Sequence, residues 1–223
     1  MRPSKPASVL LSLVLALLVL SFSISVPILF RPFYYVQIDA LHLPEQTGWS
    51  AEVIREAYDE VLDFCVFGAP FGTGELAWSE SGRSHFADVR GLFLADFAVL
   101  GVTAAAAAGF LLLYKAKGLR FHRFAGRGPA FWAGTGAAAA VLMVAGLAAL
   151  DFDRAFVVFH AIFFPGKDNW IFDPAADQII LVMPEVFFRN CALLIGGVLL
   201  ACCAGLVLWD VLARRRSRTA ALR

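Results

Sequence analysis

The chain has 223 residues, of which 60% are hydrophobic, and its mean hydropathy is +0.72. A soluble domain of this size cannot cover so much apolar surface with polar residues, so the composition indicates an integral membrane protein. The formal net charge of +1 gives no indication of a nucleic-acid partner. The four cysteines form no CxxC pair, which excludes a disulfide framework and indicates buried thiols that pack as small hydrophobic groups.

Four stretches of the chain are long and apolar enough to cross the hydrocarbon core, which takes about 20 residues. They are residues 8–30, 91–114, 130–150 and 190–213. The third is rich in Ala and Gly and the fourth contains Gly196 and Gly197, so we expect helices to approach closely at these small residues. The first has a basic start, as a signal peptide does, but its apolar run is too long and continues through Phe30, so we expect it to remain uncleaved.

Most of the 19 Lys and Arg residues gather in three short segments on one side of the predicted spans: the N-terminus, residues 115–129 and residues 214–223. The positive-inside rule places these segments, and with them both termini, in the cytoplasm. Residues 31–90 and 151–189 carry most of the acidic residues and are expected outside. The sequence therefore predicts an all-α protein of a bacterial plasma membrane, with four transmembrane helices and an extracytoplasmic cap formed by these two segments.

The two outer segments contain local signals of their own. Residues 31–90 are too long for a simple loop, and Ser50 followed by apolar residues at helical spacing predicts an amphipathic helix that ends near Gly68. Residues 155–165 are apolar but too short to span, so they are expected at the membrane interface. Asp173-Pro174 predicts a helix start, with Asp as N-cap, and Pro184-Glu185 is expected to begin the last helix.

His85 is the first candidate for chemistry. If the second helix begins near this residue, His85, Asp88 and Asp96 fall on one helix face. A carboxylate one turn from a histidine can orient its ring and raise its basicity. Asp96 would lie inside the membrane, where a carboxylate normally faces the bundle interior or a water-filled cavity; the alternative is that it snorkels or pairs with an arginine.

His160 is the second candidate, and it stands in a run of aromatic residues. A single histidine in such a run is usually packed with one hydrogen bond, but the predicted topology places His160 on the same side of the membrane as His85. Two histidines that meet at the outer interface can form an acid–base pair, since each titrates near neutrality. A metal site built from both histidines with Asp88 or Asp173 is an alternative that has no compact ligand signature.

Four strings together carry a resemblance to a known family. They are His85-Phe86-x-Asp88-Val89-Arg90-x-Leu92-Phe93, Phe159-His160-x-Ile162-Phe163-Phe164-x-Gly166, Trp170-x-Phe172-Asp173-Pro174 with Asp177, and Pro184-Glu185-x-Phe187-Phe188. In this order, between these spans, they resemble the four-helix bacterial membrane family of the lipoprotein intramolecular transacylase (Lit). The match extends from about residue 30 to the fourth span.

The resemblance implies an acyl transfer. In this family the sn-2 acyl chain of a diacylglyceryl-modified N-terminal cysteine moves to that cysteine's own α-amino group. The family's two catalytic histidines match His85 and His160, with His160 preferred as the base. Supporting residues are then expected at Asp88, Asp96, Asp173, Asp177 and Trp170, and pocket residues at Phe156, Phe163 and Phe164. The implied partners are lipid-modified lipoproteins and the bilayer, and no metal or organic cofactor is required.

Two other kinds of function remain open from the residues alone. One is a membrane lipid hydrolase or metalloenzyme that uses the same two histidines. The other is a non-enzymatic envelope accessory protein whose cap binds a partner. No serine-hydrolase elbow, phosphate loop or HExxH motif occurs in the sequence, so neither alternative gains a motif of its own.

Overall fold

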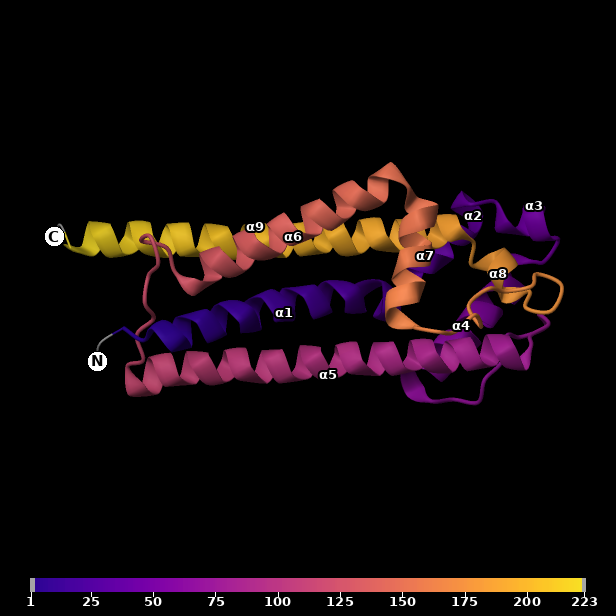
Figure 1. Ribbon diagram of the computed structural model, residues 1–223, viewed down its shortest axis with the longest axis horizontal. Helices are drawn as coiled ribbons and strands as arrows, with labels where there is room; N and C mark the ends of the chain where they lie inside the picture. The colour runs from indigo at the N-terminus through magenta and orange to yellow at the C-terminus, as the bar shows by residue number, and fades with distance from the viewer. Residues whose placement is uncertain (1–2, 222–223) are drawn as a thin grey trace. The chain divides into compact units, whose positions relative to one another are not determined.

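Figure 1 follows the chain through a computed structural model that describes residues 3–221, with side chains as far as Arg215. Within these residues the secondary structure is helical apart from two isolated β-bridges, which confirms the all-α prediction. The helices are α1 (Lys5–Leu29), α2 (Pro32–Ala40), α3 (Leu43–Thr47), α4 (Ala51–Phe67), α5 (Glu80–Lys117), α6 (Pro129–Leu150), α7 (Phe152–Phe163), α8 (Ile179–Val182) and α9 (Glu185–Ala221). Arg2 and the side chains of the predicted basic tail beyond Arg215 lie outside the described residues.

Helices α1, α5, α6 and α9 are long and apolar enough to cross a membrane, which confirms the four predicted spans. Two of them extend well beyond the apolar stretch that predicted them. Helix α5 begins at Glu80, before the apolar run that starts at Gly91, and α9 begins at Glu185, directly after Pro184 as expected. The apolar run marks only the part of a helix that suits hydrocarbon, and polar turns can continue the same helix into water.

The chain divides into two compact units. The first, here called the basic unit, comprises residues 1–24, 97–146 and 195–223. The second, here called the histidine unit, comprises residues 25–96 and 147–194. The basic unit thus contains the predicted basic loop, whereas the histidine unit contains His85, His160 and all of both predicted outer segments.

Close helix packing in the basic unit depends on Gly134 of α6. A Cβ atom added there would lie 2.7 Å from the carbonyl oxygen of Cys203 in α9, so only glycine permits this approach. Val19 of α1 joins Leu199 and Cys203 of α9 in the buried cluster beside it. The prediction for Gly196 and Gly197 is wrong, because no described neighbour lies within 4 Å of a Cβ added at either position.

Hydrogen bonds join the predicted basic segments within the basic unit. The amide of Ser4 donates to the carbonyl of Arg120 over 2.8 Å, and the amide of His122 donates to Ser8 Oγ over 2.6 Å. The carboxylate of Asp210, only 5% exposed, accepts from the amide of Gly128 over 3.0 Å. The N-terminus, the loop between α5 and α6, and the last part of α9 are therefore tied together.

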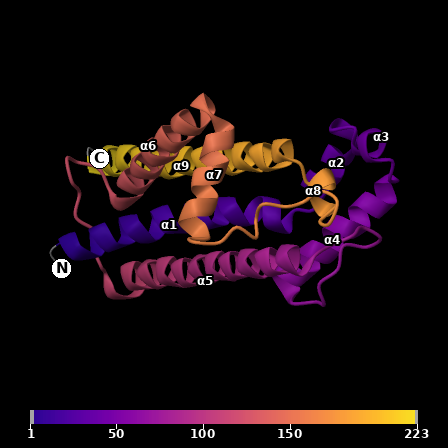
Figure 2. The same ribbon diagram turned by 45° about the vertical axis from the view of Figure 1, so that its right-hand side comes forward.

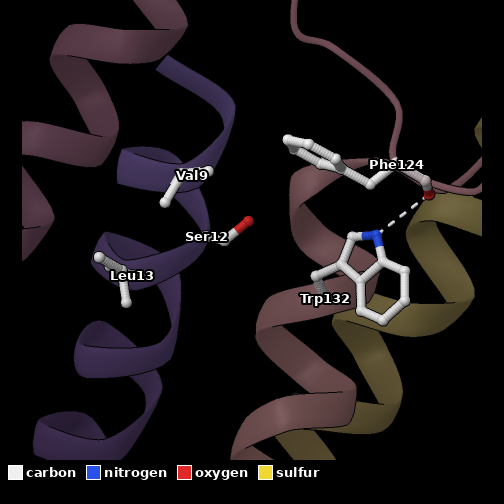
Figure 3. Close-up of a pocket in the computed structure, with 5 residues that line it drawn as sticks. All are labelled: Val9, Ser12, Leu13, Phe124 and Trp132. Atoms are coloured by element: carbon white, nitrogen blue, oxygen red, sulfur yellow. Dashed lines mark hydrogen bonds between the residues drawn. The ribbon is translucent and has the colours of Figure 1, made fainter. Parts of the chain in front are cut away.

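The basic unit also contains a groove of about 400 Å³ (Figure 3). Val9, Ser12 and Leu13 of α1 line it together with Phe124 and Trp132. The indole Nε1 of Trp132 donates to the carbonyl of Phe124 over 3.2 Å, as the dashed line in Figure 3 shows. The lining residues include no titratable side chain, so this groove offers apolar space without a group for acid–base chemistry.

In the histidine unit, α8 packs near α2, α3 and α4 (Figure 2). The ring of Tyr34 in α2 stacks on Tyr58 in α4 with centroids 3.8 Å apart, and its hydroxyl donates to the carbonyl of Val182 in α8 over 2.7 Å. The predicted amphipathic helix is confirmed as α4. Ser50 Oγ accepts from an amide in its first turn, and Gly68 ends it at a φ of 75°, which favours glycine.

The predicted helix start at Asp173-Pro174 is wrong. The side chain of Asp173 accepts from the amide of Ala175 over 3.0 Å, and its carbonyl accepts from Ala176 and Asp177, which closes a turn instead of a helix. The next helix is α8, at Ile179. The Asp177 carboxylate accepts from Ser79 at the start of α5, which ties this turn to that helix. Aspartate before proline favours both a turn and a helix start, so the local sequence alone does not separate them.

Candidate active site

The two histidines lie together in the histidine unit. Their ring centroids are 5.8 Å apart, with an angle of 31° between the ring planes. Each residue is only 6% exposed. Two adjacent buried imidazoles can accept, store and return protons at a site from which bulk water is excluded.

The start of α5 determines where His85 lies. Ser79 precedes the helix, and its amide and hydroxyl both donate to the buried Asp177 carboxylate over 2.8 Å. The Ser79 hydroxyl in turn accepts from the amide of Gly82 over 3.0 Å, as an N-cap side chain does. A Cβ added at Gly82 would lie 2.1 Å from Asp177 Oδ1. Asp177 therefore anchors the helix turn that carries His85.

The carbonyl of Phe156, one turn earlier in α7, fixes the tautomer of His160. His160 Nδ1 lies 2.8 Å from that oxygen. A carbonyl oxygen only accepts, so Nδ1 carries the proton and Nε2 of the neutral ring keeps its lone pair. Burial lowers the pKa of His160 and outweighs this hydrogen bond, which acts in the opposite direction. His160 therefore presents a neutral ring with a basic Nε2.

Aromatic side chains surround both rings. Phe164 is 4% exposed and lies beside both of them, with centroid distances of 4.9 Å to His85 and 5.6 Å to His160. Trp170 stacks on His160 at 4.4 Å, and Phe156 approaches the same ring to 4.3 Å. This enclosure disfavours a positive charge. Burial and the nearby His160 lower the pKa of His85, which precedes the apolar stretch of α5, to about 4.

A polar network lies next to His85. The Asp88 carboxylate accepts from Lys167 Nζ over 2.5 Å and from Asn169 Nδ2 over 3.0 Å. The bond from Lys167 is the main cause that lowers the pKa of Asp88, so this carboxyl is ionised. The sequence suggested that Asp88 orients His85 directly. The structure instead gives Asp88 two other partners, and one of them, Asn169, also interacts with His85.

Three other predicted residues do not contact the histidines in the described structure. Asp96 lies further along α5 and accepts from Ser25 Oγ over 2.8 Å, so its partner is a serine of α1 and not an arginine. Asp173 is exposed in its turn. Phe163 is 49% exposed and rests on Phe159, with centroids 4.6 Å apart.

Sequence reasoning missed Lys167, Asn169 and Phe172. Lys167 and Asn169 belong to an irregular turn, where no periodic pattern shows which way a side chain points. The ring of Phe172 lies 5.5 Å from His85, and its place in the Trp170-x-Phe172 string was the one available signal. Among the described residues, no group of three or more His, Cys, Asp or Glu side chains is arranged to hold a metal ion.

The fold and the site define a class: a four-helix membrane protein whose non-spanning segments enclose a pair of buried histidines. The family model described as lipoprotein intramolecular transacylase Lit matches residues 9–188, so the chain belongs to the Lit family.

Solved structures agree with this assignment. The in meso structure of Lit from Bacillus cereus is 25% identical, covers 94% of this chain and 96% of its own, and superposes with a TM-score of 0.77. Two structures of the same protein with a histidine replaced by arginine or by alanine are also 25% identical and cover 94% of this chain, with TM-scores of 0.74 and 0.73. They cover 92% and 94% of their own chains. A comparison with curated proteins finds no match.

Proposed function

We propose that this chain moves the sn-2 acyl chain of a diacylglyceryl-cysteine lipoprotein to the α-amino group of the same cysteine, and that His85 and His160 carry out the proton transfers. The observation that carries the proposal is the pair of buried imidazoles, 5.8 Å apart, in a member of the Lit family. The lipid-modified substrate and the apolar enclosure of the two rings are mutually compatible.

The reaction removes two protons from the attacking nitrogen. The amine nitrogen attacks the ester carbonyl carbon, a C–N bond forms, and the bond from that carbon to the glyceryl oxygen breaks. An α-amino group has a pKa near 8 and is mostly protonated at neutral pH. Its nitrogen therefore loses two protons in becoming an amide: one ends on the glyceryl oxygen and the other is released to water.

The geometry supports His160 as the base that removes the first proton from the α-ammonium group. Its Nε2 lone pair is available because Nδ1 donates to the Phe156 carbonyl. Its lowered pKa keeps the ring neutral at pH 7, as a general base requires. His85 then takes the second proton and returns it to the departing glyceryl oxygen. General acid–base catalysis of this kind contributes roughly 10²- to 10⁴-fold to a rate.

Substrate positioning supplies the rest of the catalysis that we propose. Amine and ester belong to one molecule, so the protein has to fold that molecule until nitrogen and carbonyl carbon are in near-attack contact, which can supply several kcal/mol. Trp170 stacks on His160 and is partly exposed, so it is suited to contact the lipid part of the substrate, while the buried Phe164 packs against both histidine rings. Phe156 completes this apolar surface beside His160.

We place this site on the outer side of a plasma membrane. The three segments rich in Lys and Arg are tied together in the basic unit, and the positive-inside rule assigns them to the cytoplasm. Residues 31–90 and 151–189 would then form the extracytoplasmic cap around the histidines. The amphipathic α7, which exposes Val157, Ile162 and Phe163, suits the membrane interface.

The test is expression in a bacterial strain whose reporter lipoprotein carries a diacylglyceryl cysteine with a free amine. The transfer leaves the mass unchanged, so fragment spectra of the N-terminal lipopeptide must locate each acyl chain. The proposal expects one chain on nitrogen, with a large loss in His85→Ala and His160→Ala. His122→Ala is the matched control, since this histidine lies in the basic unit and should keep full transfer.

The alternatives leave different products. A lipid hydrolase would release a fatty acid and leave a lighter peptide with a free amine. An accessory protein would leave the diacylglyceryl peptide unchanged, and its cellular role would survive both histidine substitutions. Either result, with the protein shown to be folded and inserted, would contradict the proposed transfer.

A further inference from the structure

Two buried polar atoms at the site have no hydrogen bond of standard geometry within the described chain: His85 Nδ1 and Asn169 Oδ1. Their side chains are neighbours at the start of α5, because the Asn169 amide contacts Ser84, directly before His85, and Asp88, three residues after it. A carboxamide oxygen only accepts hydrogen bonds, and one nitrogen of a neutral imidazole carries a proton that it can donate. The two atoms therefore complement each other as donor and acceptor.

The Asp88 carboxylate determines which way the Asn169 amide points. An ionised carboxylate only accepts hydrogen bonds, so the NH₂ group of Asn169 has to face it, and the distance from Nδ2 to Asp88 Oδ2 is 3.0 Å. The same NH₂ group lies 3.4 Å from Ser84 Oγ. Rotating the amide by half a turn would set its oxygen against the carboxylate, and two acceptors in contact repel. Oδ1 is therefore left for His85.

We infer that Asp88, acting through the Asn169 amide, holds His85 in the tautomer that carries its proton on Nδ1, so that Nε2 is the nitrogen available to the substrate. Asp88 and Asn169 are then positioning residues. The inference deepens the proposed function: the Phe156 carbonyl imposes the same tautomer on His160, so both rings present a basic Nε2. Two such nitrogens match the two protons that the α-ammonium group loses in becoming an amide.

Lys167 has a separate part in this network. Its ammonium binds the other oxygen of Asp88 and lowers the pKa of that carboxyl further. The titratable or charged groups that act on His85 are His160, Asp88 and Lys167. Removing the Lys167 ammonium leaves an ionised carboxylate at neutral pH, because an unperturbed aspartate has a pKa near 4. The tautomer of His85 should therefore survive loss of Lys167.

The test is ¹⁵N NMR of the full-length protein in lipid or detergent with ¹⁵N-labelled histidine, because protonated and bare ring nitrogens have widely separated shifts. The His85 signals are assigned by their loss in His85→Gln. In the unsubstituted protein we expect a proton on Nδ1 and a bare Nε2. Asp88→Asn should change this, since an amide at position 88 can donate to Asn169 Oδ1 and allow Asn169 to turn its NH₂ group toward His85. The proton should then move to Nε2.

Three controls make the result decisive. Lys167→Met keeps the carboxylate and should keep the tautomer. Asn169→Asp keeps an acceptor opposite Nδ1 and should keep it as well. The signals of His160, held independently by Phe156, should be unchanged in every variant and report that the site remains folded.

A bare Nδ1 on His85 in the unsubstituted protein would overturn the inference, as would an unchanged tautomer in a folded Asp88→Asn variant. Transfer activity gives a second readout. Asp88→Asn should lower kcat roughly tenfold or more with little change in KM, as loss of an orienting partner does. If the tautomers behave as expected but the unsubstituted protein transfers no acyl chain, the proposed function fails while the role of Asp88 and Asn169 stands.

Discussion

The basic unit and the histidine unit both bury polar groups within apolar surroundings, but in different ways. In the basic unit, Asp210 binds a backbone amide, and the groove beside Trp132 has no titratable lining. In the histidine unit, an irregular segment brings Lys167 and Asn169 against the start of α5, next to two imidazoles. Apolar space alone therefore does not make a reactive site. Acid–base chemistry also requires a polar group, here a histidine ring, whose hydrogen-bond partners leave one ring nitrogen available to the substrate.

The largest effect should come from the histidine unit. His160→Gln removes the proposed base while keeping a polar side chain, and we expect the rate of acyl transfer to fall roughly 10²- to 10⁴-fold. Ser12→Ala, in the groove of the basic unit, should leave the rate unchanged. Transfer to the amine of a synthetic lipopeptide, followed over time, measures both. Equal losses in the two variants would remove the distinction between the units.

Helix packing in the basic unit gives the next effect. Gly134→Ala places a methyl group 2.7 Å from the Cys203 carbonyl oxygen, so the helices must move apart, at a cost of about 1–3 kcal/mol. Gly196→Ala is the matched control. Its methyl group meets nothing in the described chain, and removing a helix glycine should stabilise by about 0.5–1 kcal/mol. Thermal unfolding in one detergent compares them; equal shifts would refute close packing at Gly134.

A smaller stability effect belongs to the histidine unit. Tyr34→Phe removes the hydroxyl that binds the Val182 carbonyl, and we expect a loss of about 1 kcal/mol. Tyr35→Phe should cost less, since its hydroxyl binds the Asp59 carboxylate at a partly exposed position. The same unfolding assay separates the two. A larger loss for Tyr35→Phe would mean that α8 is not held through Tyr34.

The smallest effect is a shift along the pH scale. Burial lowers the pKa of His160, so its ring should stay mostly neutral at pH 6.5, where a free histidine is half protonated. Since the neutral ring is the active base, its acid limb should lie below pH 6.5. The unfolded chain binds the proton more readily, so stability should also decline as the pH falls below 6.5. NMR titration of His160 checks this; a midpoint at or above 6.5 would contradict it.

Much of the fold follows from patterns that the sequence displays openly. Apolar runs located the four spans, and Ser50 with Gly68 marked both ends of α4. The sequence did not predict which helix face packs against a neighbour. Gly134 and Gly196 both lie in apolar helical stretches, yet only Gly134 packs against another helix. Capping signals were also ambiguous, because Asp173 closes a turn where a helix was expected.

The site residues also fall into those that the sequence indicated and those that it did not. His85 and His160 stood out because titratable rings next to predicted spans are uncommon and because the surrounding strings resemble the Lit family. Asn169 gave no signal, since its importance comes from contacts with α5 across a long sequence separation. Asp88 was identified but assigned a direct contact with His85, and only the three-dimensional arrangement places an amide beside both. Periodic sequence patterns do not predict the long-range contacts that residues in turns make.

The most direct test of the proposed transfer is a crossover experiment with the purified protein. Two diacylglyceryl lipopeptides are mixed, one with a deuterated sn-2 chain on an isotopically heavy peptide and the other unlabelled. Each peptide should keep its total mass, and its own sn-2 chain should move to its own nitrogen. Deuterated chains on unlabelled peptides would contradict an intramolecular transfer, and release of deuterated fatty acid without an amide product would identify a hydrolase instead.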